Sequence, residues 1–275
     1  MPEQLIVGDI EITVVSDGEA RMVPTEYFPA SNAAAWEAHK TFLDASGMLV
    51  FPMTCFVIRT AGKTVLIDTG LGPLQAGNYR GGDLLRELAS AGVQPADIDT
   101  VFVTHLHADH VGSAALRDEN KQLQITFPNA AYRWTQAEQD YWSSPDLPPQ
   151  QIARRDIFRA VAGRYEPADG GASLAPGVDV YWLPGHTPGH AGVVVSSGGA
   201  RAFILGDGVS CPVQLTETEW SGVGDVDGKL ARAGQEALAR ELEGEDVPVR
   251  GSHFPGLKFG RILSATGRRY WSAAT

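Results

Sequence analysis

Three histidines and an aspartate fall within six consecutive positions of the segment Thr104-His105-Leu106-His107-Ala108-Asp109-His110. His105 and His107 are two residues apart after an apolar run, and the two-residue period of a strand would point both imidazoles to one side. Asp109 and His110 follow where the sequence loses strand alternation, so their side chains can reach a second point nearby. Imidazole and carboxylate are common zinc ligands. The segment therefore predicts a metal centre that can hold two ions.

Most of the other histidines gather in glycine- and proline-rich turns that follow apolar runs. Of the seven in the chain, His186 and His190 lie in the turn 184–190, His253 lies in Gly251-Ser252-His253-Phe254-Pro255-Gly256, and only His39 stands apart. A catalytic zinc ion takes about three protein ligands and keeps a position for water. An isolated histidine is more often structural, but this clustering favours metal binding. We therefore expect the remaining ligands to come from these remote turns.

The residues around these motifs predict alternating strands and helices, with candidate ligands at strand ends. A hairpin over 55–67 leads to Asp68. Amphipathic helices are predicted over 83–91 and over 229–242, the second after a possible Asp227 cap. Further strands are predicted at 10–15, 100–104, 178–183, 191–195 and 202–205. This order predicts an α/β fold of two mixed β-sheets with helices outside, in which loops at strand ends form the site.

Composition and charge narrow the class of protein. The 275 residues are 43% hydrophobic, which is enough for one core, so we expect a single domain over 1–275. The net charge of -11 argues against a nucleic-acid partner, because such binding needs clustered cations. The start of the chain does not resemble a signal peptide, and no apolar run approaches the about 18 residues of a membrane span. We expect a cytoplasmic protein with no membrane partner, in which Cys55 and Cys211 stay reduced.

The order of these motifs resembles the metallo-β-lactamase superfamily of metal-dependent hydrolases. Its landmarks appear in order as Leu66-Ile67-Asp68-Thr69-Gly70, the segment 105–110, the turn 184–190, Leu205-Gly206-Asp207 and the late His253. The resemblance covers nearly the whole chain. It implies a four-layer αββα sandwich, in which two mixed β-sheets are flanked by helices, and it implies two divalent metal ions, which we expect to be Zn²⁺.

The resemblance also implies which side chains hold the ions. Seven side chains would be ligands: His105, His107 and His190 for one ion, Asp109, His110 and His253 for the second, and Asp207 as a bridge between them. His186 competes with His190 as a ligand. Because the resemblance favours the second histidine of the turn, we assign His186 a supporting role beside Asp68 and Thr187, whose hydrogen bonds would position the ligands.

The implied chemistry is hydrolysis of a small ester-like bond in a carboxylic ester, lactone or phosphotriester. A metal-bridging hydroxide would attack, and Asp109 would pass a proton to the leaving group. A flavodiiron oxidoreductase would place a glutamate where His107 stands. Homoserine-lactone hydrolases place a tyrosine three residues after the bridging aspartate, where this chain has Ser210, whereas the methyl parathion hydrolase branch lacks that tyrosine. The alternatives are a mononuclear iron enzyme resembling sulfur dioxygenases and a thioester hydrolase.

Substrate selection is expected from an insertion over 19–53 that is rich in aromatic residues. A helix over 33–44 would lie above the site as a lid, although the aromatic residues could instead fill a core. The expected substrate-binding residues are Phe28, Trp36, Ser210 and Phe254. The expected partner is a small-molecule substrate, and apolar surface patches could also form a homodimer.

Overall fold

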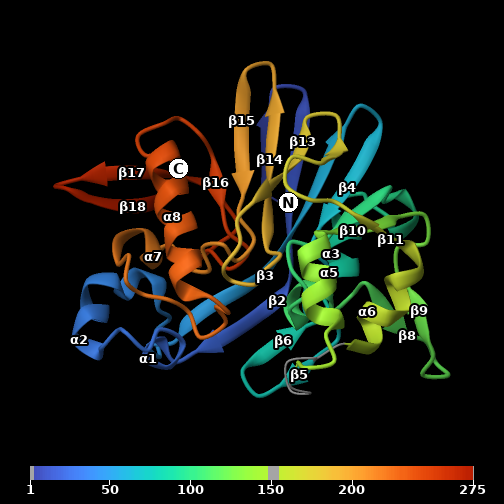
Figure 1. Cartoon of the computed structure of the whole chain (residues 1–275), viewed down its shortest axis with the longest axis horizontal. Coiled ribbons are helices and arrows are strands. Elements are labelled where there is room, and N and C mark those ends of the chain that lie inside the picture. The colour runs from blue at the N-terminus through green and yellow to red at the C-terminus, as the bar shows by residue number, and fades with distance from the viewer. Residues whose placement is uncertain (1–2, 148–154, 275) are drawn as a thin grey trace.

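Two β-sheets packed face to face form the centre of the molecule, as the computed structural model shows for residues 3–147 and 155–274 (Figure 1). Within these residues the first sheet has nine strands. Their order is β11 (Tyr165–Pro167), β10 (Ala131–Trp134), β7 (Thr100–Phe102), β4 (Lys63–Ile67), β3 (Leu49–Thr60), β2 (Ile10–Met22), β6 (Tyr79–Gly81) and β5 (Gln75–Ala76), and β1 (Glu3–Val7) pairs with β2 outside this path. Parallel pairs join β4, β7, β10 and β11, and antiparallel pairs join the others, so the sheet is mixed.

The second sheet has seven strands in the described part of the chain. Their order is β12 (Ser173–Ala175), β13 (Val178–Trp182), β14 (Ala191–Ser197), β15 (Ala200–Ile204), β16 (Val249–Arg250), β17 (Gly260–Ala265) and β18 (Arg268–Ala273). Only the pair of β15 and β16 is parallel among them. A separate hairpin joins β8 (Ala115–Arg117) to β9 (Leu123–Ile125).

Three buried clusters show that the layers follow the order helix, sheet, sheet, helix. The cluster between the sheets contains Ile12 and Ile58 of the first sheet with Val193 of the second. On the outer face of the first sheet lie α3 (Leu84–Ser90), α5 (Gln136–Ser143) and α6 (Arg155–Val161), and on that of the second lies α8 (Gly228–Leu242). Apolar side chains of the central strands fill both faces of the sheets, which confirms the predicted αββα sandwich.

The two helices predicted from periodicity are both present. α8 begins at Asp227, whose carboxylate accepts a hydrogen bond of 2.9 Å from the Leu230 N–H. Leu238 and Leu242 lie on the buried face of α8, and Leu84 and Leu88 lie on that of α3. The N-cap contact satisfies one of the orphan donors at the start of α8, and the apolar stripes dock both helices on their sheets.

The directions of the strands bring distant segments of the chain to one edge of the sandwich. Because β4, β7 and β10 are parallel neighbours, the residues after their carboxyl ends meet, and these are Asp68, the segment 105–110 and Glu138. β13 and β15 are each antiparallel to β14, and β16 is parallel to β15. The segments after β13, β15 and β16 carry His186, Asp207 and His253, so the second sheet delivers its polar residues to the same edge.

The insertion 19–53 forms the long ends of β2 and β3 and three short helices between them. These helices are α1 (Pro24–Tyr27), α2 (Ala33–Trp36) and the 3₁₀ helix η1 (Glu37–Phe42). The predicted single helix over 33–44 was therefore wrong. The α-helix ends at Trp36, and the 3₁₀ helix that follows it ends at Phe42. The insertion packs beside α7 (Val213–Thr216) through a cluster that includes Trp36 and Trp220.

The remaining helices are short. They are α4 (Ala108–Val111) and the 3₁₀ turns η2 (Pro95–Asp97) and η4 (Ala162–Arg164). Among the described residues, no helix combines the length and apolar character that crossing a membrane requires. The cytoplasmic location, the homodimer and the single-domain organisation stay predictions.

Candidate metal centre

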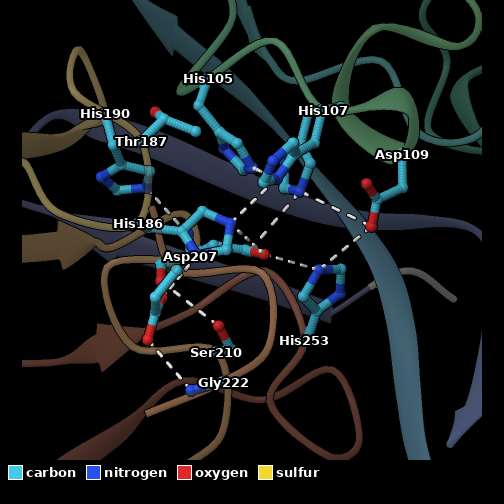
Figure 2. Close-up of polar contacts among 12 residues, drawn as sticks. His105, His107, Asp109, His186, Thr187, His190, Asp207, Ser210, Gly222 and His253 are labelled. Carbon is cyan, nitrogen blue, oxygen red and sulfur yellow. Dashed lines mark hydrogen bonds and ion pairs between the residues drawn. The ribbon is translucent and has the colours of Figure 1, made fainter. Parts of the chain in front are cut away.

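Imidazoles from three loops converge at the edge where the two sheets meet (Figure 2). His107 Nδ1 lies 2.9 Å from His105 Nε2 and 3.0 Å from His186 Nε2. The His105 ring also lies close to that of His110, with 4.0 Å between the centroids. His105, His107 and His186 therefore present three ring nitrogens to one point, as ligands of one ion would.

A second group combines carboxylates with imidazoles. Asp109 Oδ2 lies 3.4 Å from His253 Nε2 and 3.8 Å from His110 Nε2. Asp207 stands between the groups, since its Oδ2 lies 3.1 Å from His253 Nε2 and 3.5 Å from His186 Nε2, and its Oδ1 lies 3.6 Å from His110 Nε2. The Asp207 carboxylate thus faces both groups, and its role as a bridge between two ions stays a prediction.

The donor set fits divalent cations because it leaves buried polar atoms without another partner. Among the described residues, His110 Nε2 and Asp207 Oδ1 are buried and make no hydrogen bond. Leaving such atoms unsatisfied costs about 1–3 kcal/mol each. The ring-nitrogen separations near 3 Å also approach the roughly 3.3 Å between two ligands of a tetrahedral zinc ion. Both observations favour two cations at this site.

Most of these histidines are oriented by a hydrogen bond on the ring nitrogen that faces away from the cluster. His110 Nδ1 donates to Asp68 Oδ2 at 2.8 Å, and His186 Nδ1 donates to Asp225 Oδ1 at 2.8 Å. His253 Nδ1 donates to the carbonyl of Pro52 at 2.9 Å. Such bonds fix the proton on Nδ1 and leave the Nε2 lone pair for a cation. Asp68 therefore orients the His110 ring, and its role behind a metal ligand stays a prediction.

His190 lies beside the cluster and uses both ring nitrogens elsewhere. Its Nδ1 lies 2.8 Å from the Leu183 carbonyl, and its Nε2 accepts a bond of 3.0 Å from the Asp207 N–H. The structure thus corrects the expected geometry of the turn: His186 projects toward His105 and His107, and His190 holds the backbone that carries Asp207. Thr187 lies between them and donates to Glu138 Oε2 at 2.7 Å.

Burial and charge set the protonation of the cluster. Burial lowers the pKa of His105 well below its usual value, and it lowers the pKa of His107 to about 3 and that of His190 to about 3. Burial would also lower the pKa of His253, but Asp207 and Asp109 overcome it and raise that pKa to about 10.

His110 behaves in the same way as His253. Burial opposes its charge, but the carboxylates of Asp68, Asp207 and Asp109 raise its pKa well above the usual range. Conversely, the nearby imidazoles overcome burial and hold the pKa of Asp207 well below its usual value. Positive charge is therefore favoured around the two carboxylates, and protons supply it where cations do not.

The cluster forms the floor of a cavity of about 880 Å³. His107, Asp109, His186, Asp207 and His253 supply the polar floor. The walls are mostly apolar and come from the insertion, from the loop after β4, from β6 and from the loop 223–226: Met22, Val23, Tyr27, Phe51, Met53, Leu71, Leu74, Tyr79, Val223 and Val226. The volume suits a small organic molecule, whose apolar part would contact the walls while its polar part reached the floor.

Residues 49–243 match the Metallo-beta-lactamase superfamily. The chain belongs to this superfamily. The match contains most of the polar floor, with the segment 105–110 and the turn 184–190, and the turn that carries His253 lies outside it.

Relatives within the superfamily include lactonases. The N-acyl homoserine lactonase of Bacillus cereus is 23% identical over 180 residues, which cover 59% of this chain and just under two thirds, 66%, of that relative. Two solved structures share the fold over the whole chain. AidC, described as a dizinc quorum-quenching lactonase in complex with a product N-hexnoyl-L-homoserine, has a TM-score of 0.88 at 24% identity and is covered to 97%. Hydrolase AbOPH of the beta lactamase superfamily has a TM-score of 0.87 at 25% identity and is covered to 97%.

Four residues predicted to contact substrate lie elsewhere in this member of the superfamily. Phe28 and Trp36 are buried and pack around Trp220, at centroid distances of 6.0 and 5.1 Å. Phe254 is buried against Trp271, and Ser210 is buried behind Asp207. None of the four lines the cavity. For Ser210 and Phe254 the proximity in sequence to Asp207 and His253 was misleading, and for Phe28 and Trp36 the aromatic content of the insertion was misleading, because all four side chains are buried in the core.

Sequence reasoning missed Glu138, which joins two ligand loops. Its Oε1 accepts bonds from the Leu106 N–H at 2.8 Å and from the Trp142 Nε1–H, and its Oε2 accepts from Thr187 and from the Gly189 N–H. The only signal was Thr135 three residues earlier, a pattern that predicts a helix start. Asp225 was also missed, since it lies in a loop without any recognisable motif.

Proposed function

We propose that this chain is a dinuclear metal-dependent hydrolase that opens the lactone ring of small acylated lactones, with Zn²⁺ as the expected metal. The observation that supports this proposal most directly is the contrast between the polar floor of the cavity and its apolar walls. Histidines and aspartates cluster on the floor, and apolar side chains surround the approach to it. A lactone with an acyl chain matches both parts, because its ester group would reach the polar floor and its acyl chain would contact the apolar walls. The lactonase activity named for the Bacillus cereus relative and for AidC supports the same substrate class.

Three side chains would hold each cation in this proposal. His105, His107 and His186 would hold one, and Asp109, His110 and His253 would hold the other, with Asp207 between them. We propose His186 in place of His190, because both ring nitrogens of His190 are engaged with the backbone.

The cations, when bound, would supply the Lewis acidity that activates water and stabilises negative charge on the lactone oxygen. The protein's own groups prepare the site for this chemistry. Asp68 and Asp225 hold protons on the Nδ1 atoms of His110 and His186, which keeps their Nε2 atoms available. Asp109 is the more open carboxylate, with 24% of its side chain exposed against 5% for Asp207. We propose that Asp109 relays a proton from water to the leaving alcohol oxygen.

The test assays protein of known metal content against N-acyl lactones, a p-nitrophenyl ester, a thioester and a phosphotriester. We expect lactones to be the best substrates and about two metal ions per chain. His107→Ala should lower kcat/KM by roughly two or more orders of magnitude, because it removes a ligand of the group that stabilises charge. His39→Ala is the matched control, since His39 pairs with Glu217 outside the centre.

Four results would contradict the proposal. The first is that protein loaded with two metal ions opens no lactone, and the second is that His107→Ala keeps its activity on every substrate. A preparation that holds one iron ion per chain and oxidises sulfur substrates would instead favour the sulfur dioxygenase alternative. A thioester preferred over every lactone would favour the thioesterase alternative.

A further inference from the structure

Tyr27, the last residue of α1, lines the cavity with a phenol side chain that has no role in the proposed chemistry. Its backbone carbonyl accepts a hydrogen bond of 2.9 Å from the Val223 N–H, which ties the insertion to the loop after α7. Its ring meets Phe28 and Phe51 edge to face, with centroids 4.8 and 4.7 Å apart. Phe51 in turn stacks on His253, with 5.3 Å between the centroids. The ring is therefore held in one place relative to the floor of the cavity.

Gly222 fixes the position of the phenol from the other side. A Cβ atom on Gly222 would lie 2.9 Å from Tyr27 Cε1 and 3.1 Å from the Tyr27 hydroxyl oxygen. Such contacts are too close for any larger residue unless the ring moves. The Gly222 N–H also donates to Asp225 at 3.0 Å, and Asp225 orients His186. The loop that touches the phenol therefore also carries Asp225, the carboxylate that orients His186.

Tyr27 lines the cavity together with His186 and Asp207, and its hydroxyl lies on the side of Gly222. It is hydrogen-bonded to Ser210, whose own hydroxyl lies 3.4 Å from the Asp207 carbonyl, and Asp207 and Asp109 are among its charged neighbours. Two other phenols line the cavity. Tyr79 is 36% exposed and has Asp109 as a charged neighbour, and Tyr141 has Glu138 as its charged neighbour. A hydroxyl has one proton and two lone pairs. The Ser210 proton can go to the Asp207 carbonyl at 3.4 Å or turn to Tyr27. In the second arrangement the phenol proton is free for a ligand.

We propose that the Tyr27 hydroxyl donates a hydrogen bond to the carbonyl oxygen of the substrate's scissile bond, which makes Tyr27 a catalytic residue of this hydrolase. The proposal rests on the proposed function. It follows from the chemistry of the floor: the carboxylates there accept hydrogen bonds, and the ring nitrogens that face inward are used as ligands. A carbonyl oxygen that gains negative charge needs a donor, and the phenol is placed beside Asp207 to provide one.

The experiment compares Tyr27→Phe with the parent protein on the best lactone of the panel. Removal of one donor to a developing oxyanion lowers kcat by about 100- to 1000-fold in a site without metal. Here two cations would share the charge, so we expect a fall in kcat of about 10- to 100-fold with KM changed less than about threefold. Tyr270→Phe, an exposed phenol on β18, removes the same hydroxyl outside the cavity and should behave like the parent protein.

Two further measurements separate this role from a structural one. Metal content and thermal unfolding of Tyr27→Phe should match the parent protein. Binding of the ring-opened acyl product should perturb tyrosine ultraviolet absorbance in the parent protein and not in Tyr27→Phe. If Tyr27→Phe does not fold, Gly222→Ala replaces it: displacement of the ring should lower kcat although the phenol is retained.

The outcomes are distinguishable from failure of the proposed function. A parent protein that is inactive on all lactones defeats the proposed function. A parent protein that is active while Tyr27→Phe keeps kcat within twofold overturns only the role of Tyr27. A change confined to KM also overturns it, because a wall residue would produce that result.

Discussion

Asp68→Asn exchanges a single carboxylate oxygen for an amide NH₂ in the buried shell of the metal centre. Asp68 has a φ of +61°, and asparagine tolerates this left-handed conformation as well as aspartate does. Its Oδ1 accepts a bond of 2.8 Å from the Thr104 N–H, which the asparagine oxygen can keep. The substitution therefore preserves shape and backbone, and it changes only the atom that faces His110.

That atom decides which nitrogen of His110 carries the proton. The Asp68 Oδ2 atom accepts from His110 Nδ1 at 2.8 Å, whereas an amide NH₂ at the same place donates. Two arrangements then remain. Either the His110 Nδ1–H faces the amide NH₂, so that two donors oppose each other, or the proton of His110 moves to Nε2. The proton on Nε2 would occupy the lone pair that points toward Asp207 and the second cation. Either arrangement weakens the second cation site.

The expected magnitude follows from one mismatched buried hydrogen bond. An unsatisfied buried donor costs about 1–3 kcal/mol, and each 1.4 kcal/mol is about a factor of ten in an equilibrium constant. We therefore expect roughly 10- to 100-fold weaker binding of the second ion, which agrees with the usual effect of losing a supporting carboxylate. The free energy of unfolding of the metal-loaded protein should fall by a similar amount.

The assay is competition for zinc against a chromophoric chelator, with metal quantified per chain. Asp225→Asn is the mirror variant, because its carboxylate supports His186 in the other group. Asp68→Asn should weaken one of the two ions and Asp225→Asn the other, so the double variant should weaken both. Binding of two ions by Asp68→Asn with affinities within twofold of the parent protein would refute the reasoning.

Three other predictions concern the histidines. His186→Ala should reduce the metal content from about two ions to about one, whereas His190→Ala should keep both and lower the free energy of unfolding by about 1–3 kcal/mol; metal analysis and urea unfolding check this. Zinc binding at pH 7.5 should release about two protons, because His110 and His253 have raised pKa values in the metal-free protein and must lose those protons to bind; calorimetry in buffers of different ionisation enthalpy counts them. The pKa of His190 falls from 6.5 to about 3 on folding. The stability that neutral His190 contributes is therefore present above pH 6.5 and is lost as pH falls from there toward 3. Between these pH values, the free energy of unfolding of metal-free His190→Gln, measured with urea, should rise with pH by about 1.4 kcal/mol per pH unit less than that of the parent protein.

The sequence carried enough information for the layers and for the main metal motif. Periodic apolar residues and the Asp227 cap predict α8 correctly, and apolar runs that end in polar motifs predict β4, β7, β13 and β15. The segment 105–110 reaches both groups of ligands because a strand end and a helix start meet there. These features are local, so a short window of sequence is sufficient to predict them.

The contacts made by the insertion 19–53 could not be predicted in the same way. Aromatic residues in this stretch can line a cavity or fill a core, and only the tertiary arrangement decides between the two. Phe28 and Trp36 pack against Trp220, which is almost two hundred residues away. Tyr27, the immediate neighbour of Phe28, lines the cavity instead. A turn of short helix thus divides adjacent aromatic residues between the core and the site.

The assignment within the turn 184–190 depends on long-range partners in the same manner. His186 and His190 have the same side chain and similar glycine and proline neighbours, so composition gives both the same prediction. What separates them is the second ring nitrogen: His186 has a carboxylate from residue 225 to orient it, and His190 has the carbonyl of Leu183 and the N–H of Asp207. An imidazole with two backbone partners has no lone pair left for a cation, whereas one held by a carboxylate presents its lone pair to the cluster. The choice of His186 as the proposed ligand therefore depends on a carboxylate 39 residues along the chain, and a search for carboxylates behind each histidine would favour it where the motif alone does not.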